Sequence, residues 1–135
     1  MKKIHEDKFK IYYENTDSSG FVYHTAYLSM AERARSNMLN KDFSELTIML
    51  KTNSKFFVVK KIKVDFIKPA KLFDNLDIIT FYIGNSFTSL NLTQKIEKDG
   101  ADISKIDVQL VWIDGIKSKP IKIPRNIIAV SYTHL

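Results

Sequence analysis

The chain has 135 residues, of which 44% are hydrophobic and 27% charged, and its formal net charge is +6. These values are typical of a globular domain long enough to bury a core. No apolar stretch is long enough to cross a bilayer, and residues 1–10 lack the apolar region of a secretory signal, so we expect a cytoplasmic protein with no integral membrane segment. The absence of cysteine excludes disulfides and thiolate metal sites.

The positive charge is spread along the chain as single lysines. The sequence holds no basic stripe interleaved with aromatic residues and no nucleic-acid motif, so no nucleic-acid partner is expected. A phosphorylated small molecule is an alternative anionic partner that the same positive charge would attract. Most of the lysines are expected to form a solvated surface.

The first element in chain order is a predicted strand at residues 9–14, followed by a polar turn. Apolar side chains then recur at the spacing of a helix that begins near His24. A second, short helix is predicted at residues 43–50. The apolar stripe of the first helix consists of Ala26, Tyr27, Met30, Ala31, Ala34 and Met38.

From Lys55 onward the hydrophobic period changes to two, which indicates strands. The first of these strands alternates up to Phe66, and Pro69 follows it. Three further alternating runs occupy residues 79–83, 90–97 and 103–113.

Turn signals separate these runs and suggest how they connect. Lys98-Asp99-Gly100 predicts a hairpin between the last two strands. After Pro124 a short turn or helix is expected through Ile127, Ile128 and Val130, and the final residues are expected to lack attachment to the domain. The order is therefore strand, helix and four strands.

Strands joined by short loops pair antiparallel, and an amphipathic helix must bury its apolar stripe. The sequence therefore predicts an α+β fold, in which an antiparallel sheet of about five strands curves around one long helix. We expect this fold to form a single domain over residues 1–135.

The polar turn at residues 15–20 allows two interpretations of Asp17. Its composition is that of an ordinary turn, in which Asp17 is an Asx-turn or capping residue. His24 taken alone is more often structural than catalytic. The three histidines, at positions 5, 24 and 134, are too dispersed for a metal site, so we expect no metal.

The position of the turn supports a catalytic interpretation. If the helix begins near His24, unpaired N–H groups project from its first turn. These donors and the helix dipole stabilise negative charge, such as develops on a thioester oxygen when its carbonyl is attacked. A carboxylate one short loop away can attack the carbonyl or take a proton from water.

Two segments resemble a known family. Asp17-Ser18-Ser19-Gly20-Phe21-Val22-Tyr23-His24-Thr25-Ala26-Tyr27, followed by Glu32-Arg33-Ala34-Arg35, resembles the signature of the YbgC-like, 4-hydroxybenzoyl-CoA thioesterase family. Phe66-Ile67-Lys68-Pro69-Ala70, with Asp74 and Leu76 beyond it, resembles the second characteristic stretch of that family. The resemblance extends from about residue 10 to about residue 130.

The resemblance implies a hot-dog fold and an enzyme that hydrolyses acyl-CoA thioesters without a cofactor, in lipid metabolism. It implies that Asp17 acts as nucleophile or general base and that the backbone N–H of His24 polarises the carbonyl. Tyr23, Tyr27 and Glu32 are assigned to substrate binding. A homodimer with sites at the subunit interface is implied, which in relatives assembles further into a tetramer or larger form.

The chain departs from the family pattern at three positions. Ser19 stands where relatives often have a second glycine. Phe21 replaces a smaller aliphatic residue, and we expect it to reshape the acyl pocket. Phe66 replaces a common tyrosine. None of the three departures removes an expected catalytic group.

Three alternatives remain open at this point. Acyl carrier protein could replace CoA as the carrier, because its acidic surface would suit a chain of charge +6. A hot-dog hydratase would add water to a double bond and leave the thioester intact. A binding module would hold acyl-CoA without turnover.

Overall fold

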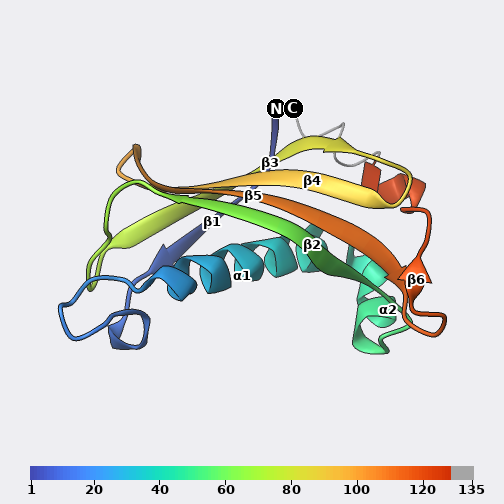
Figure 1. The fold of residues 1–135 in the computed structure, drawn as a ribbon, viewed down its shortest axis with the longest axis horizontal. Coiled ribbons are helices and arrows are strands. Elements are labelled where there is room, and N and C mark those ends of the chain that lie inside the picture. The colour runs from blue at the N-terminus through green and yellow to red at the C-terminus, as the bar shows by residue number, and fades with distance from the viewer. Residues whose placement is uncertain (129–135) are drawn as a thin grey trace.

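The computed structural model describes residues 1–128, apart from the side chain of Glu45. One long helix lies in the concave face of a curved sheet (Figure 1). The helical elements are η1 (Tyr13–Asn15), α1 (His24–Asp42), η2 (Ser44–Leu46) and α2 (Thr47–Lys51). The strands are β1 (Lys2–Lys10), β2 (Lys55–Phe66), β3 (Asn75–Asn85), β4 (Ser89–Lys98), β5 (Ala101–Asp114) and β6 (Lys119–Pro120).

The five long strands pair antiparallel in the order β1-β3-β4-β5-β2, and the two-residue β6 pairs with β5. β1 and β2 are therefore the two edges of the described sheet. The β4–β5 hairpin turns at Asp99 and Gly100, whose φ angles of 50° and 82° suit the predicted Asp-Gly turn. The α+β prediction, with an antiparallel sheet wrapped around one long helix, is confirmed.

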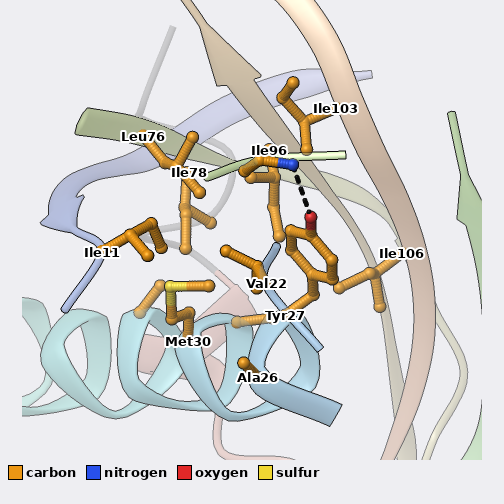
Figure 2. Packing of buried hydrophobic residues seen from close by; sticks show 13 residues of the cluster. Ile11, Val22, Ala26, Tyr27, Met30, Leu76, Ile78, Ile96, Ile103 and Ile106 are labelled. Atoms are coloured by element: carbon orange, nitrogen blue, oxygen red, sulfur yellow. Dashed lines mark hydrogen bonds between the residues drawn. The ribbon is translucent and has the colours of Figure 1, made fainter. Parts of the chain in front are cut away.

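Small side chains allow α1 to lie close to the sheet. Ala26, Ala31 and Ala34 are almost fully buried on the face of α1 that meets the strands. Figure 2 shows Met30 and Tyr27 of α1 against isoleucines of the sheet at the N-terminal end of the helix. A second apolar cluster surrounds Trp112, Met38 and Phe43 at the other end.

A polar link joins α1 to the middle of the sheet. The Arg35 guanidinium donates to Gln94 Oε1 at 2.7 Å, and Gln94 Nε2 donates to the Ala31 carbonyl at 2.9 Å and to Thr80 Oγ1 at 3.1 Å. Burial lowers the pKa of Arg35 from its ordinary value. Because each polar group has a partner, the link fixes the position of α1 along the strands.

The prediction of a first strand at residues 9–14 is wrong at both ends. β1 spans Lys2–Lys10, and Tyr13–Asn15 form a 3₁₀ turn instead. The turn closes because Asn15 Oδ1 accepts from the Tyr12 N–H at 2.9 Å. The sequence of β1 does not show the apolar–polar alternation of a strand, because the polar His5 occupies a buried position. Its imidazole pairs there with the Asp7 carboxylate at 2.8 Å.

The other predicted elements agree with the structure within a few residues, whereas the two-residue β6 was not predicted. The predicted short helix at residues 43–50 is present as η2 and α2, and residues 125–128 form a helical turn. Val130 and the final residues lie outside the described residues. Within residues 1–128 no helix is long and apolar enough to cross a membrane.

Candidate active site

Asp17 is the first residue of an exposed loop that is closed by a bridge between Thr16 and Val22. The Asp17 carboxylate accepts hydrogen bonds from the Ser19 hydroxyl and from the Ser19 backbone N–H, the latter at 2.8 Å. Gly20 donates to the Asp17 carbonyl at 3.1 Å with a φ of +82°, a conformation that glycine adopts without strain. Asp17 thus has the Asx-turn geometry that its composition suggests.

These contacts also determine the protonation of Asp17. The Ser19 hydroxyl, and after it the Ser19 backbone N–H, stabilise the carboxylate and lower the pKa of Asp17 from its ordinary value. The group is therefore ionised at neutral pH, which is the form that a nucleophile or a general base requires. The turn geometry and a catalytic role are compatible.

The helix start predicted near His24 is confirmed, since α1 spans His24–Asp42 with Tyr23 as its N-cap. Tyr23 supplies no side-chain cap, and the Ala26 N–H bonds to the Tyr23 carbonyl at 3.0 Å. Within residues 1–128, the N–H groups of His24 and Thr25 have no hydrogen-bond acceptor. The first turn of α1 therefore retains free donors for an anion or a polarised carbonyl oxygen.

The His24 side chain borders an apolar cavity. Its imidazole stacks on the Phe66 ring at a centroid distance of 4.2 Å, and the Tyr27 ring lies 5.9 Å from that of Phe66. A cavity of about 210 Å³ opens beside this stack. Its lining consists of Val22, His24, Tyr27, Phe66, Ile67, Lys68 and Pro69.

The structure places the three predicted substrate-binding residues in different surroundings. Tyr27 borders the cavity but is almost fully buried, and its hydroxyl accepts from the Ala70 N–H at 3.0 Å (Figure 2). Tyr23 faces away from this cavity toward β1, and its hydroxyl donates to the Glu14 carbonyl at 2.9 Å. Glu32 is exposed two turns along α1 and borders neither this cavity nor the one beside β1 that Tyr23 faces.

Within one protomer, the cavity unites His24 and Tyr27 but not Asp17, which lies on the neighbouring loop. Phe21 is also absent from the lining, and its ring lies 5.7 Å from the Lys71 ammonium instead. Sequence reasoning noted Phe66 only as a departure from a pattern, and missed its contact with His24. The described residues contain no group of side chains suited to a metal ion.

The fold and this cavity define a hot-dog protein with free donors at a helix N-terminus. The chain matches the model of the "Thioesterase-like superfamily" over residues 12–130. It is 38% identical over 122 residues to "Acyl-CoA thioester hydrolase YbgC" of Escherichia coli O6:H1, an alignment that covers 89% of this chain and 90% of that protein. It is 33% identical over 127 residues to "Acyl-CoA thioesterase YbgC" of Haemophilus influenzae, covering 93% and 92% of the two chains.

A solved structure agrees at the level of the fold. The 1,4-dihydroxy-2-naphthoyl-CoA thioesterase of Synechocystis superposes with a TM-score of 0.85 at 18% identity, covering 95% of each chain. The chain therefore belongs to the thioesterase-like superfamily, and within it to the YbgC-like thioester hydrolases that its motif indicates.

Proposed function

We propose that this protein hydrolyses acyl-CoA thioesters to a free acid and CoA, with the reaction taking place at the N-terminus of α1. The observation that carries the proposal is the pair of unpaired N–H groups at His24 and Thr25, beside an apolar cavity. The activity printed for the curated relatives supports it.

The residues suggest how the reaction proceeds. The acyl group occupies the cavity against Phe66, and the carbonyl oxygen accepts from the His24 N–H. A nucleophile adds to the carbonyl carbon, and the oxygen takes up negative charge that the N–H and the helix dipole stabilise. The carbonyl then re-forms as the carbon–sulfur bond breaks, and the CoA thiolate leaves and takes up a proton.

Asp17 supplies the attacking group in one of two ways. As a nucleophile, its ionised carboxylate adds to the carbonyl and forms an anhydride that water hydrolyses. As a general base, it takes a proton from the water that attacks. Either role requires the ionised carboxylate, which is the form that the contacts from Ser19 stabilise.

We further propose a homodimer that pairs the β2 edge with the same edge of a second copy. Five large apolar side chains on or just after β2 are 38–50% exposed, which is unfavourable for an edge in water. An antiparallel pairing of identical strands gives a closed two-fold interface. The exposed residues are Val58, Val59, Ile62, Phe66 and Ile67. Because Phe66 also borders the cavity, this interface would adjoin the site.

Light scattering in solution should give a mass of at least twice the 15.6 kDa of one chain. Ile62→Glu places a carboxylate on the proposed interface and should shift the mass toward one chain, with hydrolysis reduced in parallel. Lys41→Gln, an exposed change in the last turn of α1, serves as the control. A fully active monomer of the natural chain would contradict an interface site.

An α,β-unsaturated acyl-CoA distinguishes hydrolysis from the hydratase alternative. We expect free thiol to appear while the double bond persists. The reason is that the free N–H donors at His24 are suited to stabilise the oxygen of the thioester carbonyl, which is C1 of the acyl chain. A thiol reagent and the ultraviolet absorbance of the enoyl group report the two products. A hydratase must place its acid and base further along the acyl chain.

Loss of the enoyl absorbance without new thiol would refute the proposal in favour of hydration. Neither signal with a broad panel of acyl-CoA substrates would favour a binding module. The same panel carried on acyl carrier protein tests the alternative carrier. A cytoplasmic location and a role in lipid metabolism stay predictions from the sequence.

A further inference from the structure

A second cavity, of about 500 Å³, lies on the other side of the start of α1. It is bounded by the end of β1, by the segment that contains η1, and by the side of α1 that faces β1. Tyr23 borders this cavity, whereas His24, the next residue, borders the apolar one beside Phe66. The two cavities therefore lie on either side of the start of α1, one toward each edge of the sheet. We call the larger one the β1 groove.

The β1 groove is positively charged. Lys8, Lys10 and Arg33 border it, against the single carboxylate of Glu14 in its described lining. Lys8 lies 3.8 Å from Asp77 in an exposed ion pair, a contact that contributes little stability. Within residues 1–128, Arg33 has no ion pair or hydrogen bond. A guanidinium in this state is available for a phosphate, which it binds through two parallel N–H donors.

Aromatic rings complete the lining of the β1 groove. Tyr12 and Tyr23 both border it and are 52% and 40% exposed. The backbone N–H of Tyr12 bonds to Asn15, and the Tyr23 hydroxyl bonds to the Glu14 carbonyl, so η1 holds both residues in place. Exposed tyrosine rings held in this way offer stacking surfaces for a base. Cations beside aromatic rings suit a phosphorylated nucleotide.

The axial separation of His24 and Arg33 is comparable to the length of the CoA arm. Arg33 follows His24 by nine residues, so it lies about 13.5 Å further along the axis of α1, at a rise of about 1.5 Å per residue. The pantetheine arm of CoA has a main chain about as long as four amino-acid residues, which spans about 14 Å when extended. Nine residues are about 2.5 turns, so the two side chains lie on opposite sides of α1, and an extended arm must cross the start of the helix to bring the CoA phosphates toward Arg33.

We propose that the β1 groove binds the nucleotide end of CoA, with phosphates at Arg33, Lys8 and Lys10 and the adenine against Tyr12 or Tyr23. This assignment rests on the proposed function, since it takes the thioester to lie at His24. The acyl group then occupies the cavity toward β2, and the nucleotide occupies the groove toward β1.

Binding of adenosine 3′,5′-bisphosphate, measured by calorimetry, tests the groove without turnover. Arg33→Gln should raise its Kd by about 10-fold, because a hydrogen bond to a charged group is being removed. Lys8→Gln combined with Arg33→Gln should raise the Kd further. Lys41→Gln, on the same helix and outside the groove, should change the Kd by less than about 2-fold, because salt screens the charge of an exposed lysine that does not border the site.

Kinetics then link the groove to the substrate. Arg33→Gln should raise KM for acyl-CoA much more than for the matching acyl-pantetheine, which lacks the nucleotide. The bisphosphate should inhibit acyl-CoA hydrolysis competitively. A Kd unaffected by Arg33→Gln, or an equal loss in Lys41→Gln, would overturn the proposal. Binding that depends on Arg33 but does not compete with acyl-CoA would also overturn it, in favour of a separate nucleotide site.

The two proposals fail in different ways. If the natural chain hydrolyses no acyl thioester yet binds the bisphosphate through Arg33, the proposed function is wrong and the nucleotide site stands. If it hydrolyses acyl-CoA and acyl-pantetheine equally well in both the natural and the Arg33→Gln forms, the hydrolase stands and the groove assignment is wrong.

Discussion

Asp17→Asn is expected to lower kcat for acyl-CoA hydrolysis by about 10²–10⁴-fold, the usual contribution of a general base. Asparagine keeps an oxygen that can accept from the Ser19 N–H, so the turn should persist. It cannot take a proton from water or form an anhydride. Steady-state kinetics with a thiol reagent measure the loss, and thermal unfolding checks that the fold is unchanged.

Asp114 offers a matched control for this variant. Its carboxylate also accepts from backbone N–H groups in a turn, those of Ile116 at 2.9 Å and Lys117 at 3.0 Å. The Lys117 contact in particular lowers the pKa of Asp114. Asp114→Asn should therefore reproduce any effect of altering an Asx turn and leave turnover unchanged. If Asp17→Asn retains turnover within a few-fold of the natural chain, Asp17 is a turn residue only.

The pH profile gives an independent measure of the same group. The reactive form of Asp17 is ionised, so activity should persist as the pH falls until it passes through the lowered pKa of Asp17. Ser19→Ala removes the hydroxyl that contributes most to this lowering. The pKa of Asp17 should rise, and activity should be lost at a higher pH than in the natural chain. An unchanged acid limb would assign that limb to another group.

His24→Pro is expected to lower kcat by about 10²–10³-fold, the usual cost of removing one oxyanion donor. The substitution deletes the N–H proposed to contact the carbonyl oxygen. It should not disturb folding, because proline is favoured at the first position of a helix. Tyr23, with φ −76° and ψ 153°, already has the conformation required before a proline.

His24→Ala separates the backbone contribution from that of the ring. It keeps the N–H and loses the stack on Phe66, so its effect on kcat should be much smaller than that of proline. Equal unfolding temperatures for the two variants would show that a difference between their kcat values arises from the chemical step and not from a loss of folded protein. An inactive alanine variant together with an active proline variant would show that the imidazole, and not the backbone, carries the function.

Periodicity alone was enough to predict α1 and the four later strands, because their apolar residues recur at spacings of 3.6 and 2. It could not locate β1, where His5 and Asp7 occupy inward positions and satisfy one another. Nor could it recognise the 3₁₀ turn at Tyr13–Asn15, which depends on a bond from the Tyr12 N–H to Asn15. Both errors arise where polar side chains pair locally and replace the apolar pattern.

By itself, the sequence determined the family, the hot-dog fold and the proximity of Asp17 to the start of a helix. These features depend on residue types at short spacings. Only the tertiary structure decided that Phe66, 42 positions beyond His24 in the chain, stacks on its ring, and that Tyr23 and His24 border different cavities. The cause is sheet topology, because strand order and the curvature around α1 bring β2 to one side of the helix start and β1 to the other.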